Sequence, residues 1–240
     1  MIYNAVRFWK AYCRKNDSMV DRYWRGVLAS GGECERCRIG SFAFQVTDIT
    51  ILPLTGPKLE LRSLLAQYTL LEGTDNYNCT LCHQPKKRGT RFLRLPDRFA
   101  VCFQRFQNTE WGTGPEKDLR RVEFPLTDLD LGPYCVPLDT RLIQDDPEGV
   151  RMIEEDRHFR GPFIYDCYAV VCHVGSSISS GHYISYVRDH ASEDPTDWYR
   201  FNDDVVTRVK VGASKRDELE RMYRSGNQQA YLVFYKRRGT

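Results

Sequence analysis

Apolar residues recur at helical spacing in four stretches of the chain. Residues 2–13 carry apolar side chains on one face and polar ones opposite, which predicts an amphipathic helix. A second, short helix is predicted after Ser18, which can cap it, with Val20, Tyr23, Trp24 and Val27 on one face. Residues 60–71 predict a third helix, and residues 214–223 a fourth with Ser214 as its cap. No element precedes the first helix, so its apolar stripe is expected to lie exposed, as in a fragment.

Period-two alternation then marks the strands. Gly31 and Gly32 are expected to break the pattern before an alternating strand over residues 42–46. Beyond residue 90 the chain predicts a series of strands, over residues 91–95, 99–106, 164–174, 182–187, 198–201 and 230–235. Residues 139–161 are polar and acidic, which predicts a solvated surface insertion, because such a composition buries little apolar area.

Length and composition narrow the classes of protein. The 240 residues suit one large domain or two small ones, and 14 Tyr, 12 Phe and 4 Trp are typical of a sheet-rich fold. A net charge of +3, from 35 basic and 32 acidic residues, argues against nucleic-acid and membrane-surface partners. No apolar run approaches the roughly 20 residues that cross a bilayer, and the first residues lack a secretory signal. The cytosol or the nucleus is therefore the expected compartment.

Two Cys-x-x-Cys units form a candidate metal site. Cys34 and Cys37 make the first unit, and Cys79 and Cys82 the second. Two such knuckles supply four thiolates in a closed tetrahedral set, which predicts one structural Zn²⁺ rather than a catalytic ion. Chance spacing or a disulfide pair is the alternative. The neighbouring His83 is expected to be a solvated loop residue.

A second candidate site lies between residues 173 and 206. A Gly/Ser segment over residues 175–181 leads into His182 at the head of a predicted strand, which is how a fold presents a base in a cleft. If the next strand is an antiparallel neighbour, Asn202 or Asp203 at its end can orient the imidazole. A histidine with a purely structural role is the alternative. His173, in the middle of a strand, is expected to pack or to order the loop.

These constellations, in this order, resemble the ubiquitin-specific protease family of papain-like cysteine proteases. The resemblance covers nearly the whole chain and is carried by ten short motifs: Trp24–Gly26, Asn78–Cys82, Leu95–Phe99, Gln104–Phe106, Phe124–Leu126, Leu129–Leu131, Gly181–Tyr183, Trp198–Tyr199, Phe201–Asp203 and Ala230–Tyr235. It implies an α+β, hand-shaped fold that grips ubiquitin. Residues 1–30 would be remnant helices of the thumb, 31–90 the zinc-binding fingers, and 91–240 the palm with its insertion.

The resemblance also implies roles for single residues. His182 matches the family's general base, Asn202 its third catalytic residue, and Asp203 the neighbouring acid. Substrate binding is expected of three residues around this site, Gly181, Tyr183 and Trp198. Ubiquitin or ubiquitinated proteins are the implied partners.

The sequence departs from the family at its nucleophile. Neither the Gly-Asn-Thr-Cys-Tyr box nor the Gln-x-Asp-Ala-x-Glu-Phe box that follows it in the family occurs here, so the thumb is expected to be largely missing. Without a thiolate partner for its base, the chain is expected to be inactive alone. It is then either the distal half of an active deubiquitinase or an inactive ubiquitin-binding or scaffolding module, with a partner covering an exposed palm face.

Overall fold

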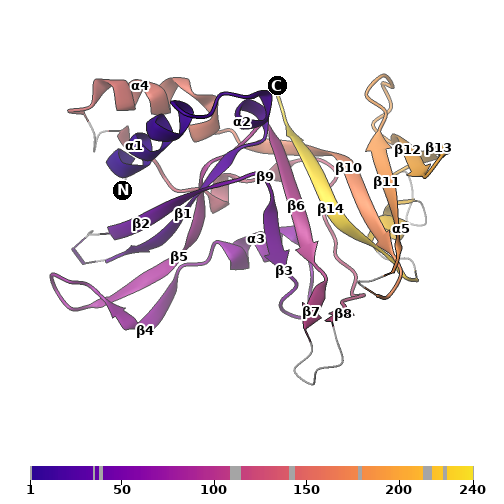
Figure 1. Cartoon of the computed structure of the whole chain (residues 1–240), viewed down its shortest axis with the longest axis horizontal. Coiled ribbons are helices and arrows are strands. Elements are labelled where there is room, and N and C mark those ends of the chain that lie inside the picture. Colours follow the sequence, from indigo (N-terminus) through magenta and orange to yellow (C-terminus); the bar gives the residue numbers. More distant parts are fainter. Residues whose placement is uncertain are drawn as a thin grey trace.

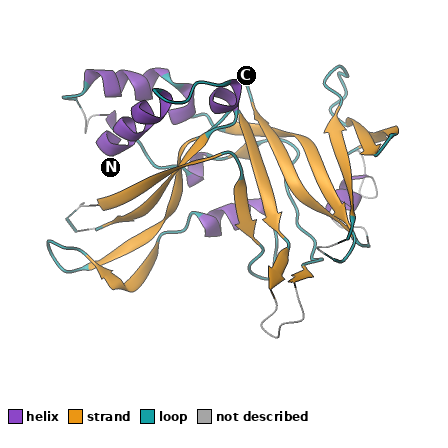
Figure 2. Cartoon of the chain, in the orientation of Figure 1, coloured by secondary structure: helices purple, strands orange, loops and turns teal. Residues whose placement is uncertain are grey.

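The computed structural model describes residues 2–34, 36–37, 40–108, 115–140, 144–177, 180–212, 218–223 and 226–239. Its helical elements are α1 Ile2–Cys13, α2 Met19–Tyr23, α3 Leu61–Tyr68, η1 Gly132–Tyr134, α4 Pro147–Glu155, η3 Arg157–Phe159 and α5 Glu218–Tyr223. Its strands are β1 Gly26–Glu33, β2 Gly40–Thr47, β3 Thr50–Pro53, β4 Glu72–Asn78, β5 Pro85–Arg94, β6 Arg98–Gln104, β7 Phe106–Asn108, β8 Pro115–Lys117, β9 Leu129–Asp130, β10 Ile164–Val174, β11 His182–Arg188, β12 Asp197–Asn202, β13 Val205–Lys210 and β14 Gln228–Arg237. Strands dominate the molecule, as the aromatic content predicts (Figure 2).

A large sheet forms one half of the molecule (Figure 1). Its strands run in the order β13-β12-β11-β10-β14-β6-β3, and β9 pairs with β10. Neighbours are antiparallel except for β3, which is parallel to β6. The main core packs on this sheet and includes Leu61 and Leu65 of α3 and Met222 of α5. The strands predicted from residue 99 onward are confirmed in this sheet, whereas the strand predicted over residues 91–95 belongs to β5, outside it. Strands β3 and β9 and the edge strand β13 were not predicted.

A second sheet, of four strands in the order β2-β1-β5-β4, extends away from the first (Figure 1). The expectation that Gly31 and Gly32 break the structure is wrong, because both lie inside β1. A Cβ atom on Gly31 would lie 2.0 Å from the backbone oxygen of Ser41 on the paired strand β2. Glycine is therefore required for these two backbones to approach each other, and it does not end the strand.

The apolar stripe of α1 is buried, contrary to the expectation of an exposed first helix. Ile2, Val6 and Trp9 join a second core with Ile153 of α4 and with Phe159. Figure 1 shows α1 and α4 side by side above the four-stranded sheet. The cover comes from residues 139–161, so the prediction of a merely solvated insertion is also wrong. The few apolar side chains of the short amphipathic helix α4, together with Phe159, therefore cover the apolar face of α1.

The short helices differ from prediction mainly at their ends. Ser18 caps α2 through a capping box with Asp21, as its sequence suggests. The helix stops at Tyr23, however, and leaves Met19 and Val20 exposed, while Val27 lies buried in β1. Helix α3 ends at Tyr68, because β4 begins four residues later. The predicted cap Ser214 lies outside the described residues.

Within the described part of the chain, every helix is too short or too polar to traverse a bilayer.

Candidate active site and metal centre

His182 opens strand β11, and Asn202 closes the neighbouring strand β12. The two strands are antiparallel neighbours, as the sequence argument required. The Nε2 atom of His182 lies 2.5 Å from Oδ1 of Asn202. Because an amide oxygen can only accept, Nε2 carries the proton and the lone pair stays on Nδ1. The imidazole is 41% exposed, so Nδ1 can act as a base toward an incoming group.

Asp203 takes a more distant place. It lies in the turn between β12 and β13 with a φ of 53°, a left-handed conformation that aspartate tolerates. Its Oδ2 atom is 3.9 Å from Nε2 of His182, and its side chain is 78% exposed. Asn202 is therefore the orienting partner, and Asp203 contributes at most a screened electrostatic field.

Gly181 and Tyr183 flank His182 and both meet His173. A Cβ atom on Gly181 would lie 2.2 Å from Nε2 of His173, so the ring fills the space that a side chain would need. The ring of Tyr183 packs against His173 at a centroid distance of 5.0 Å and is half exposed. His173 itself is 3% exposed, and burial and the nearby charge of Lys117 lower its pKa. His173 thus orders the backbone just before His182, as expected.

Trp198 lies elsewhere. It is 1% exposed and belongs to the main core, where its indole N–H donates to the carbonyl of Pro195. The predicted role in substrate binding stays a prediction, and any such effect of Trp198 would pass through strand β12.

The cysteines outside the two Cys-x-x-Cys units are poor nucleophiles where they stand. Cys167 and Cys172 are buried in β10, and burial raises the pKa of Cys172 to about 12. Burial also raises the pKa of Cys102 and Cys135. Cys13 lies on α1, in the other half of the molecule. Although the residue is exposed, partial desolvation of its thiol raises the pKa. Among the described residues, no thiol donates to or accepts from His182.

The four remaining cysteines meet at the end of the four-stranded sheet. The Sγ atoms of Cys34, Cys37, Cys79 and Cys82 all lie within 4.8 Å of one another. Cys34 and Cys82 are in direct contact, at 3.5 Å between the sulfurs. His83, next to Cys82, is exposed and is not part of this group. A spacing of this kind is what four ligands around one ion require.

The polar surroundings of the cluster also fit a metal. Hydrogen bonds from the backbone N–H groups of Cys82 and Leu81 lower the pKa of Cys79 to about 6. The backbone N–H of Cys37 likewise points at the sulfur of Cys34, 3.5 Å away. Amides aimed at the sulfurs of Cys79 and Cys34 favour thiolates, the form that binds Zn²⁺. The neighbouring Cys82 thiol instead raises the pKa of Cys37 to about 12, and a bound cation would offset this repulsion among the thiolates. The four residues fit one structural zinc ion.

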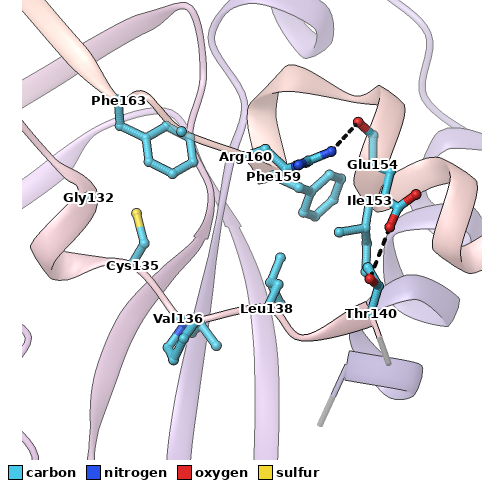
Figure 3. Close-up of a pocket in the computed structure, with 12 residues that line it drawn as sticks. Gly132, Cys135, Val136, Leu138, Thr140, Ile153, Glu154, Phe159, Arg160 and Phe163 are labelled. Atoms are coloured by element: carbon cyan, nitrogen blue, oxygen red, sulfur yellow. Dashed lines mark hydrogen bonds between the residues drawn. The ribbon is translucent and has the colours of Figure 1, made fainter. Parts of the chain in front are cut away.

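A cavity of about 470 Å³ is lined by residues between Gly132 and Phe163 (Figure 3). These residues are distant in sequence from those of both sites. The insertion forms one wall with Ile153 and Arg160, and Cys135 and Phe163 line the other side. The guanidinium of Arg160 donates to the backbone oxygen of Glu154. The cavity contains neither His182 nor the metal-site cysteines, so it is separate from the candidate active site.

Two buried cationic residues near the site were not predicted from the sequence. Arg105, 0% exposed, donates to the carbonyl oxygens of Ala230, Asp118 and Arg120. Lys117, 8% exposed, donates to carbonyl oxygens next to the loop before His182. Nothing in the local sequence signals their burial, because most of the carbonyls that accept from them, such as those of Ala230, His173 and Gly175, come from parts of the chain distant in sequence.

A histidine that is oriented by an asparagine is typical of the general base in a cysteine-protease site. A cluster of four thiols at the tip of a sheet is typical of a structural metal centre. The family comparison agrees with this class. The chain belongs to the ubiquitin carboxyl-terminal hydrolase family, whose family model matches residues 2–235.

Curated relatives match the chain along most of its length. It is 30% identical over 232 residues to ubiquitin carboxyl-terminal hydrolase 21 of Arabidopsis thaliana, covering 93% of this chain and 26% of the relative. It is 26% identical over 240 residues to ubiquitin carboxyl-terminal hydrolase 5 of Saccharomyces cerevisiae, covering 95% and 26%. The chain thus spans about a quarter of the length of these relatives.

Solved structures show the same fold. The SAGA DUB module Ubp8/Sgf11/Sus1/Sgf73 bound to ubiquitin aldehyde matches with a TM-score of 0.70 and 20% identity, covering 98% of this chain and 49% of that chain. A variant of this module bound to monoubiquitin matches with a TM-score of 0.69 and 21% identity, covering 98% and 48%. The predicted ubiquitin-specific protease fold, sheet-rich and mixed in class, is confirmed.

Proposed function

We propose that this chain supplies the ubiquitin grip and the general base of a thiol-dependent deubiquitinase, which hydrolyses the peptide or isopeptide bond after the carboxy-terminus of ubiquitin. The contact between Nε2 of His182 and Oδ1 of Asn202 carries this proposal. Family membership supports it, as do the ubiquitin-bound neighbours in fold. The nucleophilic cysteine is supplied by residues outside these 240.

In this scheme Nδ1 of His182 takes the proton of the incoming thiol. The thiolate attacks the last carbonyl carbon of ubiquitin, the imidazolium protonates the departing amine, and a thioester between the cysteine and ubiquitin remains. Nδ1 then takes a proton from a water molecule that attacks the thioester, which releases the ubiquitin carboxylate and returns the thiol. Asn202 stabilises the tautomer that leaves Nδ1 free and holds the ring in place through both steps. Gly181 and Tyr183 border the path of the ubiquitin tail.

The fingers play a structural part in the proposal. One Zn²⁺ held by the two Cys-x-x-Cys units fixes the tip of the four-stranded sheet, which contacts the body of ubiquitin. Ubiquitin or ubiquitinated proteins are the partners, and a further partner covers an exposed face of the palm. Cysteines can bind zinc only while they are not oxidised to disulfides. A reducing compartment therefore suits this site, and we place the protein in the cytosol or nucleus.

A thiol-reactive probe tests where the nucleophile lies. The chain is incubated with ubiquitin that carries a thiol-reactive group at its carboxy-terminus. We expect reversible binding without a covalent adduct, because the described thiols near the site are buried. A stoichiometric adduct that maps to a cysteine of this chain would show that the nucleophile is internal.

Replacing the base tests the chemical role of His182. His182→Ala should leave the melting temperature and the affinity for ubiquitin nearly unchanged, because the side chain is 41% exposed and makes few contacts. In a complex that contains the nucleophile, the same variant should lose hydrolysis by at least about 100-fold, the usual share of a general base. A large drop in melting temperature would instead assign His182 a structural role.

An inactive ubiquitin-binding or scaffolding module is the second candidate. The observation that favours it is the burial and raised pKa of Cys102, Cys135, Cys167 and Cys172, which leaves His182 without a thiol to activate. The same grip and zinc centre would then serve binding alone. Persistent lack of hydrolysis when a lobe that carries the family's nucleophile box is supplied in trans would decide for this module.

A further inference from the structure

The ammonium group of Lys117 lies in a cage of backbone oxygens. Its Nζ atom donates to the carbonyls of His173, Gly175 and Asn227, at 2.9, 2.7 and 3.1 Å. An ammonium has three protons and no acceptor, so three converging carbonyls satisfy it completely. The residue is 8% exposed, although lysine is among the side chains least often buried. Such an arrangement needs a reason in the fold.

The three carbonyls mark the segment that precedes His182. His173 lies next to the end of β10, and Gly175 is the first residue after that strand. Asn227 precedes β14, and its carbonyl also accepts the N–H of Gly175. Gly175 has a φ of 122°, so the chain leaves β10 through a conformation that glycine alone adopts easily. Lys117 therefore fastens the start of the turn to the neighbouring strand.

The far end of the same segment rests on His173. Gly181, directly before His182, lies so close to this ring that a Cβ atom would come within 2.2 Å of Nε2. The position of the ring depends on the backbone of His173, whose carbonyl Lys117 holds. The lysine thus acts on both ends of the segment, at Gly175 directly and at Gly181 through His173.

Lys117 is itself held by a second buried cation. Arg105 donates to the carbonyl oxygens of Asp118 and Arg120, just beyond Lys117, and to that of Ala230 in β14. The N–H of Asp118 in turn donates to the carbonyl of Arg105. These bonds hold the backbone directly after strand β8, next to the residue from which the amine extends. Burial and the charge of Arg105 lower the pKa of Lys117 to about 8, which keeps three protons on the amine at neutral pH.

We propose that Lys117 is a positioning residue that holds the backbone before His182 and thereby sets the imidazole against Asn202. This inference rests on the proposed function only for its consequence, which is the capture of the ubiquitin tail beside His182. The placement itself concerns this chain alone and can be tested without ubiquitin.

The test replaces the amine and observes the imidazole. Lys117→Met keeps the length of the side chain and removes the three hydrogen bonds. In ¹⁵N-resolved NMR spectra, wild-type protein should show the Nε2–H form as the predominant tautomer of His182. In Lys117→Met we expect a mixture of tautomers and at least about tenfold faster amide exchange at Gly175, since open segments exchange faster. Asn202→Ala should disturb the tautomer but leave the exchange at Gly175 unchanged.

Lys236→Met is the matched control. This lysine lies at the opposite end of β14 in the same sheet and donates no hydrogen bond to a carbonyl among the described residues. Its replacement should change neither readout. A folded Lys117→Met protein with the wild-type His182 spectrum would overturn the proposal. Should that variant not fold, Lys117→Gln removes the charge and, with only two side-chain N–H protons, at least one of the three hydrogen bonds. Wild-type exchange at Gly175 together with the wild-type His182 spectrum in that protein would overturn the proposal equally.

Ubiquitin binding then separates this inference from the proposed function. Lys117→Met should weaken binding of intact ubiquitin about tenfold, which corresponds to 1.4 kcal/mol, and should not change binding of ubiquitin that lacks its last residues. If wild-type protein binds neither form, the proposed function fails while the NMR result still decides the role of Lys117. Equal losses for both ubiquitin forms would contradict a role at the tail.

Discussion

Gly181 lies next to the candidate site at a position that has no room for a Cβ atom. A Cβ atom there would lie 2.2 Å from Nε2 of His173 and 2.8 Å from the backbone oxygen of Val174. We expect Gly181→Ala to lower the free energy of unfolding by about 1–3 kcal/mol, the usual cost of overpacking, and to weaken ubiquitin binding. Urea unfolding and calorimetric titration measure both effects.

The control for this substitution is Gly73→Ala, at an exposed strand position where no atom lies within 4 Å of the added carbon. It should leave stability and binding nearly unchanged. The double variant with His173→Ala should recover part of the stability lost in Gly181→Ala, because the two residues are in contact. Additive losses would mean that the ring of His173 is not what excludes the side chain.

At the scale of elements, the zinc centre should control one sheet and not the other. Strand β4 pairs with β5 at Glu72, Gly73 and Asn78, and the cysteine cluster joins Cys79, directly after β4, to Cys34, directly after β1. We expect one zinc per chain by native mass spectrometry, and we expect chelation to speed amide exchange in β4 and in the end of β1 near Cys34. Exchange in β10 and β14, the centre of the large sheet, should stay slow.

Two variants make the zinc prediction specific. Cys37→Ser should reproduce the effect of the chelator, because three thiolates bind Zn²⁺ more weakly than four. Cys13→Ser changes an exposed cysteine of α1 and should keep the metal and the exchange pattern. Unchanged exchange in β4 after complete removal of zinc would show that the metal does not hold the sheet.

The sequence predicts elements well where local pattern and burial agree. Central strands β10, β11, β12 and β14 follow from apolar alternation, and Ser18 marks the start of α2. The edge strand β13 is mostly exposed, with Val205 and Val206 about half accessible, so no alternation betrays it. The Cys-x-x-Cys spacing predicts the thiol cluster, since ligand and motif are local. The burial of Lys117 is not predictable, because its site is created by three carbonyls, of His173, Gly175 and Asn227, that lie more than 50 residues further along the chain.

At the scale of the whole molecule, a histidine joins the insertion to the large sheet. His158 follows α4, and its Nδ1 atom lies 2.6 Å from Oδ1 of Asp156. Its Nε2 atom lies 3.3 Å from Oδ1 of Asp97, which directly precedes β6. The main core and the core under α1 therefore meet across a histidine between two carboxylates. The strength of this joint depends on the charge of the ring.

Burial opposes that charge, but the hydrogen bond to Asp156 and the nearby carboxylate of Asp97 outweigh it and raise the pKa of His158. A raised folded-state pKa means that protonated His158 stabilises the fold, fully below the unfolded pKa of about 6.5 and progressively less as the pH rises through the folded value. We expect His158→Gln to cost more stability at about pH 6 than at about pH 9, by urea unfolding.

His190 provides the opposite case, because burial and then Lys236, Arg188 and Arg98 lower its pKa. His190→Gln should therefore cost less at the lower pH, and a pH-independent loss in His158→Gln would show that the joint does not depend on its charge.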